Sequence, residues 1–188
     1  AAAKAAEDVT ARKAAEKAEE AGDTLKIFAS EKAMPHLADQ SYNICFGADQ
    51  APYLDIDGVL GLNGGDKIEV GKDLTVTIID TPGHMVDHIS IWDESTGNII
   101  VGDAIGMKWT DNFIVSNPNS EFWNEKDYLQ SLETLRALNV KTICLAHFGC
   151  LTGDEAKNFL DDSPGTYRKW MEVFDQNTDK IDDIPSLV

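Results

Sequence analysis

Three apolar segments of the chain each end at a glycine-containing turn that carries a side chain of the metal-binding type. His84 follows Thr-Pro-Gly, Asp103 follows Gly102, and His147 precedes Phe-Gly. Buried strands that stop at sharp turns present polar residues at their tips, and α/β proteins build metal sites there. Two imidazoles and a carboxylate suit zinc, iron or manganese, and a carboxylate can bridge two ions. We therefore predict that these three residues are metal ligands.

Each of the three residues also has an ordinary structural explanation. His84 is compatible with a hydrogen-bonded loop histidine, Asp103 with the N-cap of a following turn, and His147 with a histidine at the edge of the core. Any one of these explanations suffices for a single residue. Together they do not explain why three strand ends in one half of the chain carry ligands, so the combination favours a metal site.

The elements that must position these residues follow from hydrophobic periodicity and turn chemistry. Apolar or alternating runs between turn residues predict strands at 25–29, 67–70, 74–80, 89–93, 98–101 and 141–145. Helical spacing or richness in alanine predicts helices at 1–21, 31–37, 125–138 and 166–174. The stretches 39–65 and 104–124 carry no regular pattern and are predicted to be irregular. The middle of the chain is therefore predicted to be an antiparallel or mixed meander.

The size and charge of the chain limit its class and its partners. With 188 residues, of which 43% are hydrophobic and 26% charged, it is predicted to form one globular domain. A net charge of −17 repels phosphate backbones and anionic lipids, so neither nucleic acid nor a membrane is expected as a partner. The three cysteines form no Cys-x-x-Cys pair, which favours a reducing cytoplasm. The expected partner is a small-molecule substrate.

The order and surroundings of the three motifs resemble the metallo-β-lactamase-fold hydrolases. Thr81-Pro82-Gly83-His84, Gly102-Asp103 and His147-Phe148-Gly149 are similar to the later metal motifs of that family, and 88–93 is similar to the strand between them. The resemblance runs from about Leu25 to about Leu160 and implies an α/β fold, the αβ/βα sandwich, with two metal ions at one edge. By position, it implies that His84 binds the first ion, Asp103 bridges both ions, and His147 binds the second.

One part of the family pattern is absent from this sequence. The leading His-x-His-x-Asp-His motif, which supplies most of the remaining ligands and the general acid or base, does not occur, and His36 stands alone. The segment 1–21 is similar to the helix that follows that motif. We therefore expect this sequence to begin just after that motif, with the N-terminal part of the sandwich missing. We assign no catalytic residue, and we expect little activity from these 188 residues alone.

The resemblance implies a metal-dependent hydrolase of the glyoxalase-II-like and lactonase-like branch. Such an enzyme uses a metal-bound hydroxide on a thioester, a lactone or a related ester. Two divalent ions are implied, with zinc expected first and iron or manganese as alternatives. Two other interpretations stay open. One is an iron-dependent redox protein on the same fold, and the other is a degenerate scaffold without catalysis.

Other residues near the motifs are not included in the predicted ligand set. His88 is left out of the ligand set, because it is a contact behind the ligands, a substrate contact or a residue packed at the sheet edge. Cys144 is predicted to be inert packing. Cys150 is predicted to be a loop thiol, with a thiolate ligand beside His147 as the alternative. For Trp109, Phe113 and Trp123, two roles stay open, which are lining a substrate pocket and covering a loop.

Overall fold

The computed structural model of the chain describes residues 26–38, 58–110, 113–116, 122–147 and 149–178. The chain divides into two compact units, Ala1–Gly61 and Leu62–Val188, which are described one at a time. The single domain predicted over 1–188 stays a prediction. The predicted helix at 1–21 lies outside the described residues, as does most of the stretch 39–65. All three residues predicted to bind metal lie in the second unit.

The first unit contains a short strand that leads into a helical turn. Its elements are β1 (Ile27–Ser30), η1 (Glu31–Ala33), α2 (Met34–Ala38) and β2 (Val59–Leu62), whose last residue opens the second unit. Ser30 caps η1, because its Oγ accepts a hydrogen bond from the backbone N–H of Lys32 at 3.3 Å. The strand predicted at 25–29 and the helix predicted at 31–37 are therefore confirmed to within a residue or two.

Strand β2 corrects the prediction that 39–65 is irregular throughout. It pairs with β1 in a two-stranded sheet of the described residues. In the sequence, Gly61 argues against a strand at this position, since glycine weakens a strand interior. In the structure the carboxylate of Glu31 occupies the space where a Cβ at position 61 would project. Because the Glu31 side chain is flexible and exposed, this contact does not require glycine, and the flanking apolar residues still form a strand.

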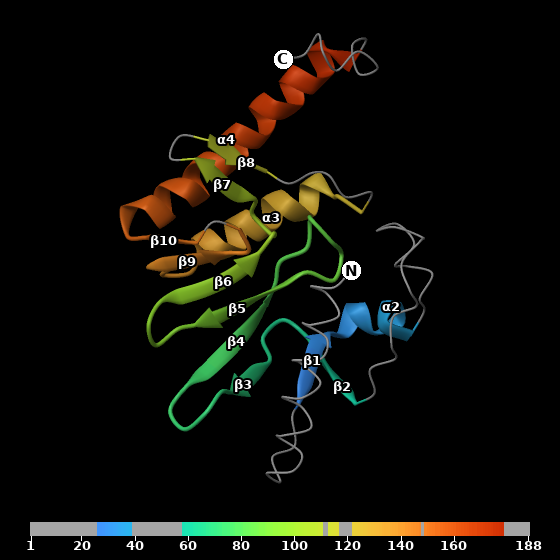
Figure 1. Cartoon of the computed structure of the whole chain (residues 1–188), viewed down its shortest axis with the longest axis vertical. Helices are drawn as coiled ribbons and strands as arrows, with labels where there is room; N and C mark the ends of the chain where they lie inside the picture. The colour runs from blue at the N-terminus through green and yellow to red at the C-terminus, as the bar shows by residue number, and fades with distance from the viewer. Residues whose placement is uncertain (1–25, 39–57, 111–112, 117–121, 148, 179–188) are drawn as a thin grey trace, which may run out of the picture. The chain divides into compact units, whose positions relative to one another are not determined.

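Six strands among the described residues of the second unit form one sheet, in the order β10-β9-β6-β5-β4-β3 (Figure 1). All neighbouring strands are antiparallel except β6 and β9, which are parallel. Strands β4, β6 and β9 therefore run in the same direction, and their carboxyl ends lie at one end of the sheet. The bounds are β3 (Lys67–Glu69), β4 (Thr75–Asp80), β5 (Ile89–Asp93), β6 (Asn98–Gly102), β9 (Thr142–Leu145) and β10 (Cys150–Thr152).

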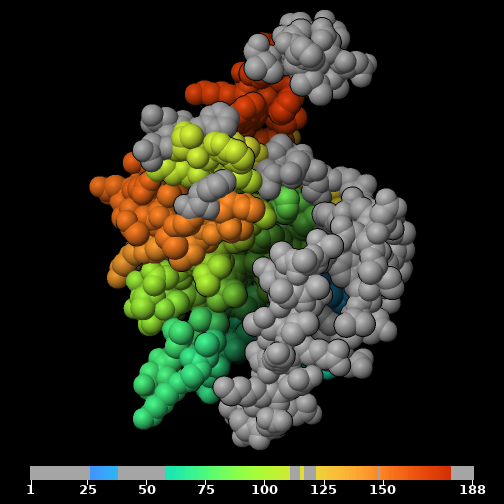
Figure 2. Space-filling view, in the orientation of Figure 1, coloured from blue at the N-terminus to red at the C-terminus, as the bar shows by residue number. Residues whose placement is uncertain are grey.

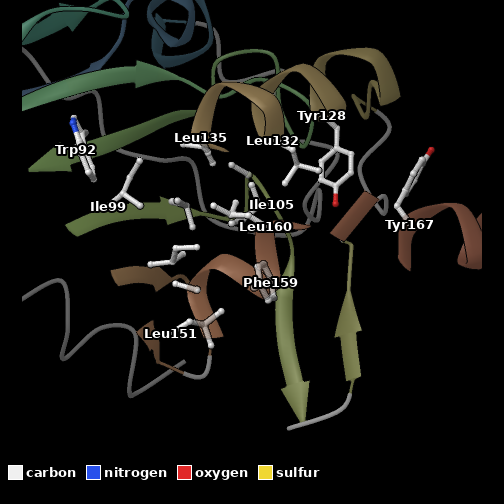
Figure 3. Close-up of a cluster of buried hydrophobic side chains, with 14 residues drawn as sticks. Trp92, Ile99, Ile105, Tyr128, Leu132, Leu135, Leu151, Phe159, Leu160 and Tyr167 are labelled. Atoms are coloured by element: carbon white, nitrogen blue, oxygen red, sulfur yellow. The ribbon is translucent and has the colours of Figure 1, made fainter. Parts of the chain in front are cut away.

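Helices α3 (Glu125–Arg136) and α4 (Asp154–Gln176) cover one face of this sheet. Along β6, Ile99 is fully buried whereas Ile100 is 52% exposed, which is the alternation of a sheet with one covered face. Figure 3 shows the buried side chains of strands and helices meeting in one cluster. Each fully buried Leu or Ile stabilises the fold by about 2 kcal/mol. The cluster comprises Trp92, Ile99, Val101, Ala104, Ile105, Tyr128, Leu132, Leu135, Ile143, Leu151, Ala156, Phe159, Leu160 and Tyr167.

Neither α3 nor α4, nor any other helix among the described residues, has the length and apolar character of a membrane-spanning segment.

Three short strands of this unit are not predicted by the sequence. The stretch 104–124 contains β7 (Met107–Thr110) and β8 (Phe113–Val115), which pair antiparallel in a small sheet of their own. Strand β10 pairs with β9 at the edge of the large sheet. A run of three or four residues is too short to show a period of two in the sequence. Whether such a run forms a strand depends on the partner strand with which it pairs. The prediction of an irregular stretch at 104–124 is therefore wrong where this hairpin lies.

Helix α4 runs through Pro164, so the start predicted at Thr166 is wrong. Proline has no N–H and cannot donate to the carbonyl one turn earlier, here that of Leu160. In the structure Arg136 of α3 supplies the missing donor, because its Nη2 donates to Leu160 O at 2.8 Å and to Asp161 O at 3.0 Å. A side chain from another helix thus compensates for the proline.

Candidate metal centre

The three residues predicted to bind metal follow the ends of strands that share one direction. His84 follows β4, Asp103 follows β6 and His147 follows β9. One end of the sheet therefore presents all three residues. Strands β6 and β9 are direct neighbours, whereas β5 separates β4 from β6. This topology places Asp103 next to His147 and puts the turn that carries His84 further along the same end.

Asp103 and His147 are in contact. The Nε2 atom of His147 lies 3.4 Å from Oδ1 of Asp103, which is longer than a good hydrogen bond. The side chain of His147 is 50% exposed and that of Asp103 is 27% exposed. Oδ1 itself is shielded from solvent and has no hydrogen-bond partner among the described residues. A shielded carboxylate oxygen without a donor costs free energy unless a donor or a cation approaches it.

A glycine turn at the end of β6 sets the backbone of Asp103. Gly102 has a φ of +52°, and a Cβ at this position would lie 2.7 Å from Nε2 of His88. The pairing of β6 with β9 shifts register between Ile100 and Gly102, where the ladder is irregular. The backbone N–H of Ala146 donates to Gly102 O at 3.2 Å. The chain before Asp103 is therefore tied to the chain before His147.

His88 holds the backbone of Asp103 from the other side. Its Nε2 accepts a hydrogen bond from the N–H of Asp103 at 3.3 Å, and its Nδ1 lies 3.0 Å from Oγ1 of Thr81. Because Nε2 is an acceptor, the neutral ring carries its proton on Nδ1 and donates it to Thr81. Thr81 in turn contacts Ser90 at 2.8 Å, and both hydroxyl-bearing residues are buried. The network fixes the ring and, through it, Asp103.

The surroundings of His88 keep its ring neutral. Burial is the main cause that lowers the pKa of His88 below its ordinary value, and the nearby His84 adds to it. The two carboxylates of Asp103 and Asp87 oppose this change but do not reverse it. The sequence leaves His88 outside the ligand set, and the structure places it behind Asp103 as a positioning residue. Thr81 and Ser90 are polar residues buried beside His88, and their presence indicates that His88 takes part in a hydrogen-bond network.

The Thr-Pro-Gly turn before His84 is fastened to helix α3. Pro82 O accepts a hydrogen bond from Oγ of Ser131 at 2.7 Å, and Gly83 O accepts one from the N–H of Asn124 at 2.9 Å. A Cβ on Gly83 would lie 2.6 to 2.8 Å from backbone and Cβ atoms of Tyr128, so only glycine allows this approach. The turn therefore rests directly on the first turns of α3.

His84 lies near the other two candidate ligands by way of His88. The two rings are 6.4 Å apart between centroids and stand edge to face at 83°. Among the described residues, no group of three His, Cys, Asp or Glu side chains is placed to hold one metal ion. The structure thus brings Asp103 and His147 together, with His84 reaching this pair by way of His88. The predicted ligand set of all three stays a prediction.

The chemistry of these donors fits a divalent metal ion. Asp103 offers a shielded carboxylate oxygen without a donor, and His147 offers an imidazole nitrogen beside it. Oxygen and imidazole donors suit zinc, iron and manganese alike. His88 fixes the carboxylate-bearing residue from behind, as residues around metal ligands commonly do. The backbone of Asp103, one of the two candidate ligands, is therefore held in place by a contact within the protein.

The aromatic residues of 104–124 and its flank fall into different environments. The ring of Trp123 packs at 4.8 Å from Tyr128 and 5.6 Å from Tyr167, centroid to centroid, so it extends the core. Trp109 of β7 is 58% exposed. For Trp123, the structure favours the role of covering the core over that of lining a substrate pocket.

A family model supports the fold assignment. The model described as metallo-beta-lactamase superfamily matches residues 3–147. A curated relative, the beta-lactamase-like protein 2 homolog of Caenorhabditis elegans, is 31% identical over 83 residues. That match covers 44% of this chain and 25% of the relative. The chain thus spans about a quarter of the length of that relative.

Solved structures share the same fold. A metallo-beta-lactamase superfamily protein from Sulfolobus tokodaii aligns with a TM-score of 0.58 at 20% identity, over 73% of this chain and 57% of that one. A flavo di-iron protein from Thermotoga maritima aligns with a TM-score of 0.50 at 16% identity, over 78% and 37%. At these identities the alignments establish the fold alone. The α/β fold predicted from the motifs is confirmed.

Proposed function

The chain belongs to the metallo-beta-lactamase superfamily, and on that basis we propose that it is a metal-dependent hydrolase of thioesters, lactones or related esters. The superfamily consists generally of hydrolytic metalloenzymes and usually binds metal ions. The observation that supports the proposal most is the shielded Oδ1 of Asp103, which lacks a donor among the described residues and faces Nε2 of His147. Such a pair at the end of parallel strands is suited to binding a cation.

The proposed roles follow from the contacts of each residue. Of two divalent ions, zinc first, His84 and Asp103 would hold one, and Asp103 and His147 would hold the other. A bound ion of this kind supplies Lewis acidity, which lowers the pKa of water and polarises a carbonyl group. His88 keeps its proton on Nδ1 and orients Asp103 through the backbone N–H. The half-exposed imidazole of His147 leaves the site open to a small-molecule substrate.

Metal binding to the chain is the first test. At about a hundredfold excess over its dissociation constant, an ion that binds only the folded state stabilises it by about 2.7 kcal/mol. For a chain of this size, that stabilisation raises the melting temperature by about 5–10 °C. We expect zinc to produce such a shift, and Asp103→Asn to abolish it. His36→Ala, on α2 in the first unit, is the matched control and should keep the full shift. An equal shift in wild type and Asp103→Asn would overturn the assignment of the site.

Substrate turnover is the second test. We expect slow hydrolysis of thioesters or lactones that depends on added metal and is lost on chelation and in Asp103→Asn. Metal-dependent stabilisation without hydrolysis of any ester would keep the site but overturn the reaction class.

The alternative is an iron-dependent redox protein, and the fold shared with a flavo di-iron protein supports it. Metal analysis of protein purified without added metal separates the two functions. Zinc together with esterase activity supports hydrolysis, whereas iron with a visible spectrum and no esterase activity supports the redox function.

A further inference from the structure

The hairpin that carries His147 also carries two cysteines on opposite strands. Cys144 lies in β9 and Cys150 begins β10, and the register of the antiparallel pair places them directly opposite each other. Both are free thiols, and Sγ of Cys150 points to Sγ of Cys144 at 3.1 Å. Neither residue contributes to the hydrophobic core. The sequence pattern predicts packing for Cys144 and a loop thiol for Cys150, and it does not predict that the two side chains are in contact.

The backbone at this position suits a bond between the two sulfur atoms. The next pair toward the turn is hydrogen-bonded, because the N–H of Leu145 donates to Gly149 O at 3.1 Å. Hydrogen-bonded and non-hydrogen-bonded pairs alternate along an antiparallel ladder, so Cys144 and Cys150 form a non-hydrogen-bonded pair. The Cα atoms of such a pair are about 4.5 Å apart. Disulfides span Cα separations of about 4.4–6.8 Å, so the bond needs little backbone movement.

The two thiols differ in access. Cys150 is exposed, whereas Cys144 is half-buried, and burial with the neighbouring Cys150 raises the pKa of Cys144 to about 11. Strand β10 is the outermost strand of the large sheet, and the orange atoms of this part of the chain lie at the surface in Figure 2. A small oxidant therefore meets Cys150 first, and Cys144 is placed to react second.

We propose that Cys144 and Cys150 form a reversible dithiol–disulfide site, oxidised by a low-molecular-weight disulfide of the glutathione class. The thiolate of Cys150 attacks one sulfur of the small disulfide, which forms a mixed disulfide and releases one small thiol. The thiolate of Cys144 then attacks Sγ of Cys150, which closes the protein disulfide and releases the second small thiol. The two protein thiols are oxidised and lose two protons, while the small disulfide is reduced to two thiols.

The proposed bond closes a ring around the candidate metal ligand. His147 lies three positions after Cys144 and three before Cys150 in the sequence. Oxidation would tie both ends of the turn that presents this imidazole, whereas reduction would leave the turn held by the hydrogen bond between Leu145 and Gly149. The inference concerns the thiols alone and does not depend on which metal or substrate the chain binds.

The test is equilibration of the folded chain with mixtures of reduced and oxidised glutathione. The background variant is Cys45→Ser, because Cys45 is the third thiol of the chain. After acid quenching and alkylation, we expect intact mass to show a monomer that has lost two hydrogens and takes up no alkylating agent. Peptide mapping should then join the segments that contain Cys144 and Cys150. Excess reduced glutathione should reverse the change.

Two single replacements in the same background serve as controls. Cys144→Ser should stop at a mixed disulfide on Cys150, and Cys150→Ser should leave Cys144 largely unmodified over the same time. A background variant that keeps both thiols alkylatable under fully oxidising conditions would overturn the proposal. Disulfide-linked dimers, or a stable mixed disulfide on Cys150 with Cys144 present, would overturn it as well.

Discussion

The turn before His84 allows a sharp test of how the candidate site is positioned, because Gly83 lies against the backbone of Tyr128. An alanine Cβ at position 83 would lie 2.6 Å from Cα, 2.7 Å from N and 2.8 Å from Cβ of Tyr128. The helix backbone cannot rotate away as a side chain can, so relieving this overlap costs about 1–3 kcal/mol. The φ of +136° adds strain of about 1–3 kcal/mol for any residue with a Cβ. We expect Gly83→Ala to lower the free energy of unfolding by about 4 kcal/mol.

Gly65→Ala is the matched control for this variant. Gly65 also has a positive φ, +94°, but a Cβ there would meet no heavy atom within 4 Å. This control therefore carries the backbone strain alone, about 2 kcal/mol, and the difference between the two variants isolates the contact with α3. Both free energies are obtained by guanidinium denaturation followed by tryptophan fluorescence and far-UV circular dichroism. Losses that agree within about 0.5 kcal/mol would refute the contact as the reason for glycine.

Four further substitutions test separate features of the fold, all by the same denaturation measurement. His88→Phe leaves the N–H of Asp103 without its acceptor and should cost about 2 kcal/mol. An unchanged free energy of unfolding would contradict the positioning role. Arg136→Ala removes the donor of two carbonyls and should also cost about 2 kcal/mol. Pro164→Ala restores a backbone donor, so the double variant Arg136→Ala/Pro164→Ala should lose about 1 kcal/mol less free energy of unfolding than the sum of the two single losses. Strictly additive losses would argue against the idea that Arg136 compensates for Pro164. Burial raises the pKa of Tyr128 to about 12 in the folded chain, compared with about 10 in the unfolded chain. The neutral phenol therefore contributes about 2–3 kcal/mol of stability below pH 10, and this contribution is lost as the pH rises through the pKa of the folded chain. Tyr128→Phe should therefore flatten the decline in stability between about pH 10 and 12, and an unchanged slope would refute it.

The strands that carry the site were predictable because their own residues encode them. The strand predicted at 89–93 agrees with β5 in both bounds, and the helix predicted at 125–138 begins with α3 at Glu125. Alternation of buried and exposed positions on a sheet with one covered face leaves a period of two in the sequence. The chain therefore predicts where β4, β6 and β9 end, and with them the places of His84, Asp103 and His147.

The features that escaped prediction depend on partners distant in the sequence. Pro164 signals a helix end only while the donor that compensates for it, Arg136 of another helix, is unknown. The role of His88 depends on a backbone N–H fifteen positions later, that of Asp103. A propensity or a motif describes a residue and its near neighbours, so contacts across the sheet and between helices lie outside its reach.

The candidate ligands are positioned by contacts that exist without a metal. Helix α3 fastens the turn before His84, His88 holds the N–H of Asp103, and the N–H of Ala146 binds the carbonyl of Gly102. These contacts are hydrogen bonds to backbone groups and close glycine packing, so their geometry is set when the sheet folds. An ion that meets ligands already in place orders fewer groups on binding and binds more tightly for the same donors. The shielded oxygen of Asp103 carries a desolvation cost, since it is held away from solvent without a hydrogen-bond donor among the described residues. Binding of the proposed cation to Asp103 would offset this cost, which would link the folding of this sheet end to metal binding.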